Sequence, residues 1–214
     1  MSLATLLLLA DGRLPSGGHA HSGGLEAQIA GGRVKEISGL DGFLRGKLAT
    51  GGLVSAAFAA AACSDVSRWS ALDAGLDART PSPALRKASR AQGRALLRAG
   101  RAMWPVAAVG RDPHQPVALG ALAAAAGLAP VQAAVAAAHG SITGPASAAV
   151  RLLGLDPYAV HALLARLAPD CDRVAEVAAA RCADPVDELP AAGAPLLDIG
   201  AEHHATWEVR LFAS

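Results

Sequence analysis

The chain has 214 residues, which is enough for one domain of ordinary size with a substantial core. Alanine makes up about a quarter of it (53 residues), whereas aromatic residues make up 3% and charged residues 17%. This composition excludes a disordered chain, which would be more polar and more charged, and it argues against an all-β protein, since alanine is depleted in strands. The formal net charge of +1 provides no general attraction to nucleic acid or to an anionic membrane. We therefore expect an all-α single-domain bundle of about eight to ten helices, with small residues at close helix contacts.

Helix start and stop signals divide the chain into short units without a fixed-period repeat or a domain boundary. Ser38–Asp41 has the form of a capping box, Ser82 and Asp156 each precede a proline suited to a first helical turn, and Gly31-Gly32 can end a helix. The expected helices lie near residues 3–10, 23–30, 40–63, 66–74, 83–103, 116–126, 130–153, 157–167, 170–182 and 195–206.

Two apolar stretches could be mistaken for membrane or signal segments. The N-terminal stretch lacks a positively charged beginning and a cleavage site, so we expect a short buried helix there. Residues 113–150 contain no Asp, Glu, Lys or Arg, but alanine has little drive to insert into lipid. We expect two buried helices joined near Gly127–Pro130, and no membrane association.

Few residue patterns suggest chemistry. Cys63, Cys171 and Cys182 form no C-x-x-C motif and fit buried, unreactive thiols in a reducing compartment. Two histidine pairs occur, His19/His21 and His203/His204. In an extended segment His19 and His21 would point to one side and could share a metal, but nothing nearby supplies a third and fourth ligand. We expect no catalytic residues and no stably bound cofactor. The isolated histidines are expected to be structural: His114, His139 and His161.

Positive charge gathers on one predicted helix. Arg86, Arg90, Arg94 and Arg98 recur every four residues and form one helical stripe. The plain interpretation is a solvated face, neutralised by the acidic C-terminal third. A contact with an acidic protein partner is the functional alternative. Nucleic acid ranks third, because the stripe has no stacking aromatic side chains.

A glycine-rich segment at 12–24 is the most unusual feature of the sequence. Glycine permits positive φ and close backbone approach, and Ser22 can cap the helix that follows. The segment resembles the N-terminal pattern L-P-x-G-x-F-x-[YF]-S-x-G-L-E of the urease accessory protein UreF family. The matching residues are Leu14, Pro15, Gly17, Ser22, Gly24, Leu25 and Glu26, whereas His19 and His21 stand where the family has aromatic residues.

Three further segments resemble the same family in the same order. Residues 90–97 are similar to its R-x-x-G-x-x-L-L helix, and residues 116–152 to its central helical hairpin. The C-terminal residues 204–214 are similar to H-E-x-x-x-S-R-L-F-x-S, with Ala205 in place of Glu and Val209 in place of Ser. The resemblance spans essentially the whole chain.

The resemblance implies a cytoplasmic, homodimeric, non-enzymatic chaperone. Such a protein would bridge a UreD/UreH-type accessory protein and a UreG-type GTPase while nickel is inserted into urease apoprotein, with nickel handled by the assembled complex. Pro15, Gly17, Ser22 and Gly24 are expected to shape the N-terminal loop, and a tail at about 203–214 to bind a partner. The expected partner-binding residues are Glu26, Arg94, His204, Arg210, Leu211 and Phe212. For Leu211 and Phe212, packing against their own domain is the alternative.

Two other function classes stay open at this stage. One is a metal-dependent enzyme built on the pairs His19/His21 and His203/His204, with His19 and His21 as weak nickel-ligand candidates. The other is a nucleic-acid binder that uses the arginine stripe, which would show strongly salt-dependent affinity.

Overall fold

The computed structural model describes residues 2–213, and this part of the chain is helical, with no strand. The α-helices, in chain order, are α1 (Leu3–Ala10), α2 (Leu25–Ala30), α3 (Ile37–Lys47), α4 (Leu53–Ser64), α5 (Trp69–Arg79), α6 (Pro83–Arg101), α7 (Gln115–Ala125), α8 (Pro130–Leu153), α9 (Pro157–Ala180) and α10 (Pro195–Ala205). Short 3-10 turns lie at Gly18–Ala20, Val66–Arg68 and Val186–Glu188. The expected all-α class is confirmed.

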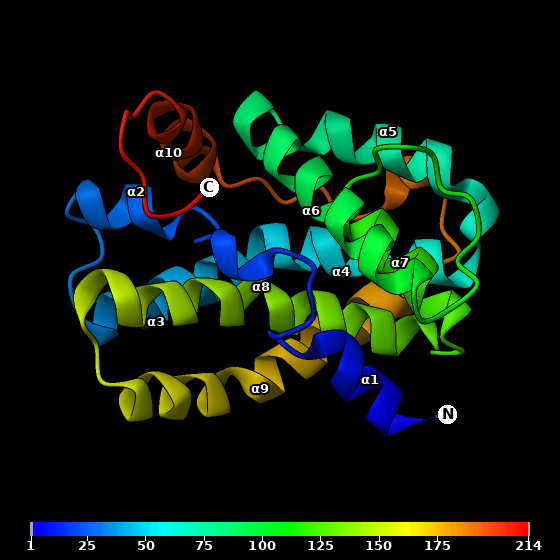
Figure 1. The fold of residues 1–214 in the computed structure, drawn as a ribbon, viewed down its shortest axis with the longest axis horizontal. Coiled ribbons are helices and arrows are strands. Elements are labelled where there is room, and N and C mark those ends of the chain that lie inside the picture. Colours follow the sequence, from blue (N-terminus) through cyan, green and yellow to red (C-terminus); the bar gives the residue numbers. More distant parts are fainter. Residues whose placement is uncertain (1, 214) are drawn as a thin grey trace.

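The core is built where α4, α7, α8 and α9 pack together. In Figure 1, α8 crosses the middle of the molecule with α4 behind it and α9 below, while α5, α6 and α7 form one end and α2 and α10 the other. Alanines line the contacts, and Ala56, Ala60 and Ala133 are fully buried. The expectation that small residues occupy the close helix contacts is confirmed.

Gly120 shows how close these helices come. A Cβ atom at this position would lie 2.3 Å from the carbonyl oxygen of Ala59 and 2.6 Å from Cβ of Ala62. Any side chain at position 120 would therefore force α7 away from α4. Gly93 plays the same part on α6, where an added Cβ would lie 2.1 Å from the carbonyl oxygen of Pro113.

Three predicted helix boundaries are wrong. The helix predicted near residues 66–74 runs on to Arg79 as α5. The capping box at Ser38–Asp41 does not form, since α3 begins at Ile37 after Glu36, and α3 continues through the π turn Leu48–Gly52 directly into α4. The predicted break near residues 168–169 is also absent, because α9 runs through Pro169. A buried stripe at Leu163, Leu167, Cys171 and Ala175 continues across the proline, and its packing outweighs the loss of one backbone hydrogen bond.

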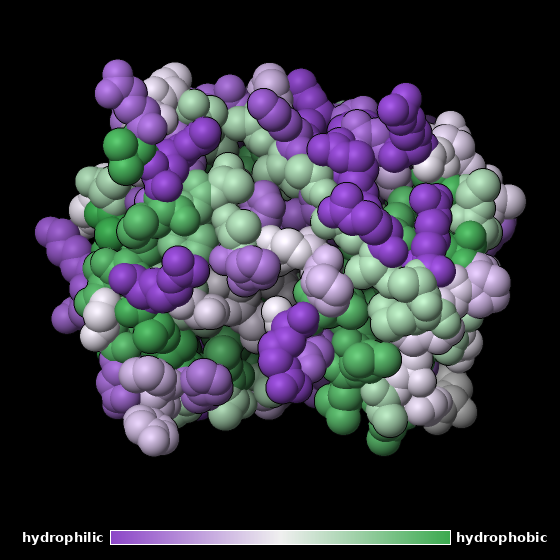
Figure 2. Space-filling view, in the orientation of Figure 1, coloured by the Kyte–Doolittle hydropathy of each residue, from purple (hydrophilic) through white to green (hydrophobic). Residues whose placement is uncertain are grey.

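The N-terminal helix forms as expected, but the expectation that it is buried is wrong. Of its leucines only Leu9 is buried, whereas Leu3 and Leu7 are 72% and 71% exposed. Figure 2 shows this apolar surface over α1. The caps predicted at Ser82 and Asp156 and the helix end at Gly31-Gly32 are confirmed.

The apolar stretch at 113–150 forms two helices, α7 and α8, joined through Gly127 at φ 71°. Among the described residues, one helix, over residues 37–64, is long and apolar enough to cross a membrane, and 61% of its most apolar window is buried inside the fold. All three cysteines are free thiols, and burial raises the pKa of Cys63 and Cys171 to about 11. Cys63 and Cys171 are therefore poor nucleophiles at neutral pH.

Candidate functional site: the docked tail and the polar cavity

The glycine-rich segment places Glu26 in the interior at the start of α2. Gly24 adopts φ 91° and begins the helix, and the buried hydroxyl of Ser22 accepts a hydrogen bond from the Glu26 amide at 3.2 Å. Gly17, at φ 76°, begins the preceding 3-10 turn, whereas Pro15 is exposed. Positive φ explains why glycine stands at positions 17 and 24.

The Glu26 carboxylate holds the C-terminal tail. It accepts hydrogen bonds from His204 Nε2 at 2.8 Å, from the Leu211 amide at 3.0 Å and from the Phe212 amide at 3.1 Å. Glu26 and His204 are both buried. A buried carboxylate is stable only when its oxygens are hydrogen-bonded, and here the tail itself supplies two of the donors.

Phe212 completes the docking of the tail. Its ring is buried with the Arg151 guanidinium 4.8 Å from its centroid, and the Ala213 amide donates to the carbonyl oxygen of Ala20 at 2.7 Å. The alternative of packing within its own domain therefore holds for Phe212, and the idea of an exposed Phe212 anchor is wrong for this conformation. Leu211 behaves differently, since it is 65% exposed.

Five of the six predicted partner-binding residues lie at the tail and divide into two groups, whereas Arg94 lies on α6. Glu26, His204 and Phe212 lie together and position the tail from inside, while Arg210 and Leu211 project from it. Sequence reasoning placed these residues in one functional group but did not anticipate that Glu26 and His204 bind each other across 178 positions of the chain.

Neither histidine pair gains a third ligand in the structure, since residues 2–213 contain no group of three or more His, Cys, Asp or Glu side chains that could hold a metal ion. His204 is buried against Glu26, whereas its neighbour His203 is exposed and contacts the Trp207 ring edge-on. His19 is exposed and His21 is half-buried at the cavity described below.

The arginine stripe on α6 forms its ion pairs mainly with aspartates of α5 and of the loop before α7, and not with acids of the C-terminal third. Arg90 binds Asp73 at 2.9 Å and Asp77 at 2.6 Å, both on α5, and Arg94 pairs with Asp112 in the loop before α7. The expectation that the C-terminal third supplies the counter-charges is therefore wrong for Arg90 and Arg94. The charges of the stripe hold α5, α6 and the α6–α7 loop together.

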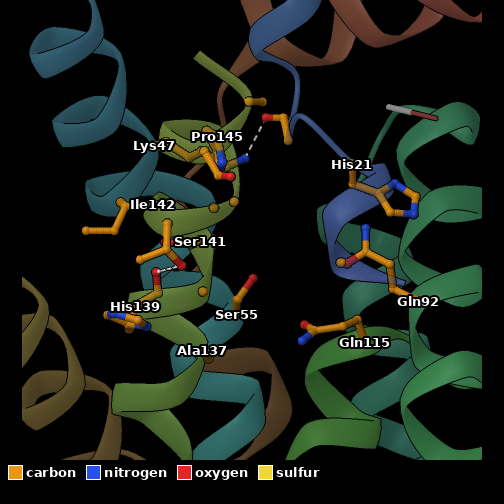
Figure 3. Close-up of a pocket in the computed structure, with 18 of the residues that line it drawn as sticks. His21, Lys47, Ser55, Gln92, Gln115, Ala137, His139, Ser141, Ile142 and Pro145 are labelled. Atoms are coloured by element: carbon orange, nitrogen blue, oxygen red, sulfur yellow. Dashed lines mark hydrogen bonds between the residues drawn. The ribbon is translucent and has the colours of Figure 1, made fainter. Parts of the chain in front are cut away.

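A large cavity opens between α8 and the α6–α7 pair. Its volume is about 1100 Å³, and Figure 2 shows a hollow near the centre of this face. Lys47, His139 and Ser141 lie on one side of it, and His21, Gln92 and Gln115 lie across from them (Figure 3). Burial lowers the pKa of His21 and His139, with the charge of nearby His19 contributing at His21.

A hydrogen-bonded serine, histidine and aspartate at the wall of this cavity escaped sequence analysis. His114 is buried, with Nδ1 3.0 Å from Ser89 Oγ and Nε2 2.9 Å from Asp77 Oδ1. Burial works against ionisation of Asp77, but the hydrogen bond from His114 and the charge of Arg90 outweigh it and lower its pKa. No sequence motif marks this set, because Asp77 lies on α5, Ser89 on α6 and His114 directly before α7.

Comparison with known proteins identifies the family. The UreF family model matches residues 34–168. The chain is 49% identical to the urease accessory protein UreF of Mycobacterium sp. strain JLS, 47% identical to that of Mycobacterium marinum and 43% identical to that of Mycobacterium tuberculosis H37Rv. Each comparison covers 100% of this chain and 99% of the relative. The chain belongs to the UreF family of urease accessory proteins.

UreF proteins are accessory proteins and not enzymes. We therefore assign a structural role, and not a catalytic one, to Ser89, His114 and Asp77. The Ser89 hydroxyl also accepts a hydrogen bond from the backbone N–H of Gln115 at 3.1 Å. The Asp73 carboxylate accepts one from the backbone N–H of His114 at 2.7 Å. These bonds fix the start of α7 against α5 and α6. Because Gly93 has no side chain, the backbone at Pro113 can lie directly against α6. This explains the glycine in the R-x-x-G-x-x-L-L segment.

Proposed function

We propose that this UreF protein is a non-enzymatic adaptor in urease maturation. It links a UreD/UreH-type accessory protein to a UreG-type GTPase while nickel is inserted into urease apoprotein, and nickel is carried by the assembled complex rather than stored on this chain. The protein acts in the cytoplasm as a homodimer. The observation that carries the proposal is the docked tail, which presents Arg210 and Leu211 outward from a buried anchor.

The surface around the tail has the composition of a protein interface. Val209 is 84% exposed and Leu211 65%, and on neighbouring α10 Leu196 and Ile199 are 61% and 67% exposed. Leu196, Ile199 and Trp207 also line a small cavity of about 300 Å³. Exposed apolar side chains beside a charged residue are typical of the centre of a protein–protein contact.

The test is co-expression with a UreD/UreH-type protein, followed by size-exclusion chromatography with light scattering. We compare the wild type with an Arg210→Ala/Leu211→Ala double variant. Because interface hot spots contribute about 2 kcal/mol or more, the double variant should weaken the complex by at least about thirty-fold. The protein alone, measured by the same method, should have the mass of a dimer.

Tyr158→Ala provides the matched control, since Tyr158 is 86% exposed on α9, away from the tail. Binding that survives in the Arg210→Ala/Leu211→Ala variant as well as in the control would move the contact away from the tail. No complex from folded wild-type protein would contradict the adaptor function itself.

A further inference from the structure

The centre of the large cavity combines one lysine with neutral polar side chains. Of the described residues that line the cavity, Asp11 and Asp198 are the carboxylates, and Asp11 is paired with Arg13 at the surface. The other cationic groups are engaged: Arg79 binds backbone carbonyls of the 186–190 segment and Arg151 covers the Phe212 ring. Lys47 therefore supplies the available charge.

The position of Lys47 is fixed by its surroundings. Its side chain leaves the end of α3, lies beside Pro145 of α8 and donates to the carbonyl oxygen of Gly23 at 2.8 Å (Figure 3). Gly23 has φ 61°, and a Cβ there would lie 3.0 Å from Pro145 Cγ and 3.1 Å from Lys47 Cε. A side chain at position 23 would displace the lysine, so the glycine-rich segment is shaped around it.

The protein provides an acceptor for one of the three N–H donors of the half-buried ammonium group. The carbonyl oxygen of Gly23 is the one hydrogen-bond acceptor of this group among the described residues, which offer it no carboxylate within ion-pair distance. Burial lowers the pKa of Lys47 to about 8. An anion beside the group would remove part of that desolvation cost and favour the charged form.

Neutral donors face the same space. Ser55 projects from α4, Gln92 from α6 and Gln115 from α7 (Figure 3). The structure gives none of these three side chains a hydrogen bond to the described residues. A hydroxyl and two amide groups can each donate to an oxygen atom. A charged donor among neutral donors, with no carboxylate of the described residues within ion-pair distance of the lysine, is the arrangement that selects an oxyanion over a metal cation.

We propose that this cavity binds a small oxyanion of the carbonate or phosphate class, with Lys47 as its charge partner and Ser55, Gln92 and Gln115 as neutral donors. The site does not depend on the proposed adaptor function, because it lies within one chain and needs neither a partner protein nor nickel.

The experiment uses lysine ε-carbon NMR on the full chain. The chain has three lysines, of which Lys35 and Lys87 are exposed and serve as internal references. Sodium phosphate or sodium bicarbonate is titrated at constant ionic strength, with sodium chloride as the balancing salt. We expect a saturable shift of the Lys47 resonance alone and a rise in its pKa. In phosphate, affinity should fall about tenfold per pH unit well above pH 8, since binding needs the charged lysine.

Variants locate the anion. Lys47→Met should abolish heat release on phosphate or bicarbonate addition in calorimetry, whereas Lys87→Met should leave it unchanged. A Gln92→Leu/Gln115→Leu variant keeps Lys47 and should weaken binding at least tenfold. A response to one oxyanion alone would support the site and define which shape it accepts. The proposal is overturned if neither anion moves Lys47 more than Lys35 and Lys87, or if the double glutamine variant binds as tightly as the wild type.

Discussion

The α4–α7 contact and the docked C-terminal tail are held in opposite ways. At the first, glycine and alanine bring backbones together, and there is no room for one further atom at Gly120. At the second, one carboxylate gathers a side chain and two backbone amides from a distant part of the chain. The α4–α7 contact thus depends on a position without a side chain, Gly120, whereas the docking of the tail depends on one side chain, that of Glu26.

This difference indicates where the protein can change shape. Close packing along α4, α7 and α8 is continuous and apolar, so we expect it to open only with global unfolding. The tail has few buried apolar contacts apart from Phe212, and its hydrogen bonds end on a single residue. An interface segment of an adaptor is expected to belong to this less stable part.

The largest effect is expected in the core. Gly120→Val places a branched side chain against the Ala59 carbonyl oxygen and should reduce the free energy of unfolding by about 3 kcal/mol or more, or prevent folding. Gly140→Ala on α8 is the control, because nothing lies within 4 Å of a Cβ there. It should be neutral or stabilising by up to about 1 kcal/mol. Urea denaturation measures both, and equal effects would disprove the close-contact argument.

The tail should respond to a single charge change. Glu26→Gln keeps the shape of the side chain but turns one acceptor oxygen into a donor, opposite groups that themselves donate. We expect a loss of about 1–3 kcal/mol and faster hydrogen exchange at the Leu211 and Phe212 amides, with core amides unaffected. Glu176→Gln, on the exposed side of α9, is the control. Unchanged protection of those two amides would mean that Glu26 does not hold the tail.

The arginine stripe separates into structural and free positions. Arg90→Met removes bonds to Asp73 and Asp77 and should cost about 1–3 kcal/mol, since the partly buried aspartates lose a charged partner. Arg98 is exposed and has no ion pair among the described residues, so Arg98→Met should stay within about 0.5 kcal/mol of wild type. Thermal unfolding distinguishes the two. Equal losses would show that the stripe acts through its overall charge.

Asp77 should make part of the stability dependent on acid pH. Its pKa is lowered in the folded chain, so the carboxylate contributes stability above its ordinary pKa near 4 and loses that contribution as the pH falls through the lower folded value. The difference in melting temperature between wild type and Asp77→Asn should therefore shrink from pH 6 to pH 3. Asp172→Asn, at an exposed position, should show no such trend. A constant difference for Asp77→Asn would exclude a folded-state shift.

Sequence patterns predicted the helices well because proline, glycine and capping residues act locally. The caps at Ser82 and Asp156 involve neighbours two or three positions away. The pairing of Glu26 with His204 and the set of Ser89, His114 and Asp77 depend on helix packing, which no local pattern encodes. The same limit explains the error at Pro169, where tertiary contacts of the buried stripe on α9 outweigh a local helix-breaking signal.

The smallest effect on the free energy of unfolding is expected at the exposed side chains of the tail. Leu211 and Val209 are mostly exposed, so Leu211→Ser and Val209→Ser should change the free energy of unfolding by less than about 0.5 kcal/mol. They should also leave the exchange of the Phe212 amide unchanged, because Glu26 binds the tail through backbone amides. Loss of partner binding with an unchanged unfolding curve would then assign Leu211 to the interface. Destabilisation by either serine would show instead that these side chains pack within the isolated chain, and that the division of the tail into an inner anchor and an outer surface is wrong.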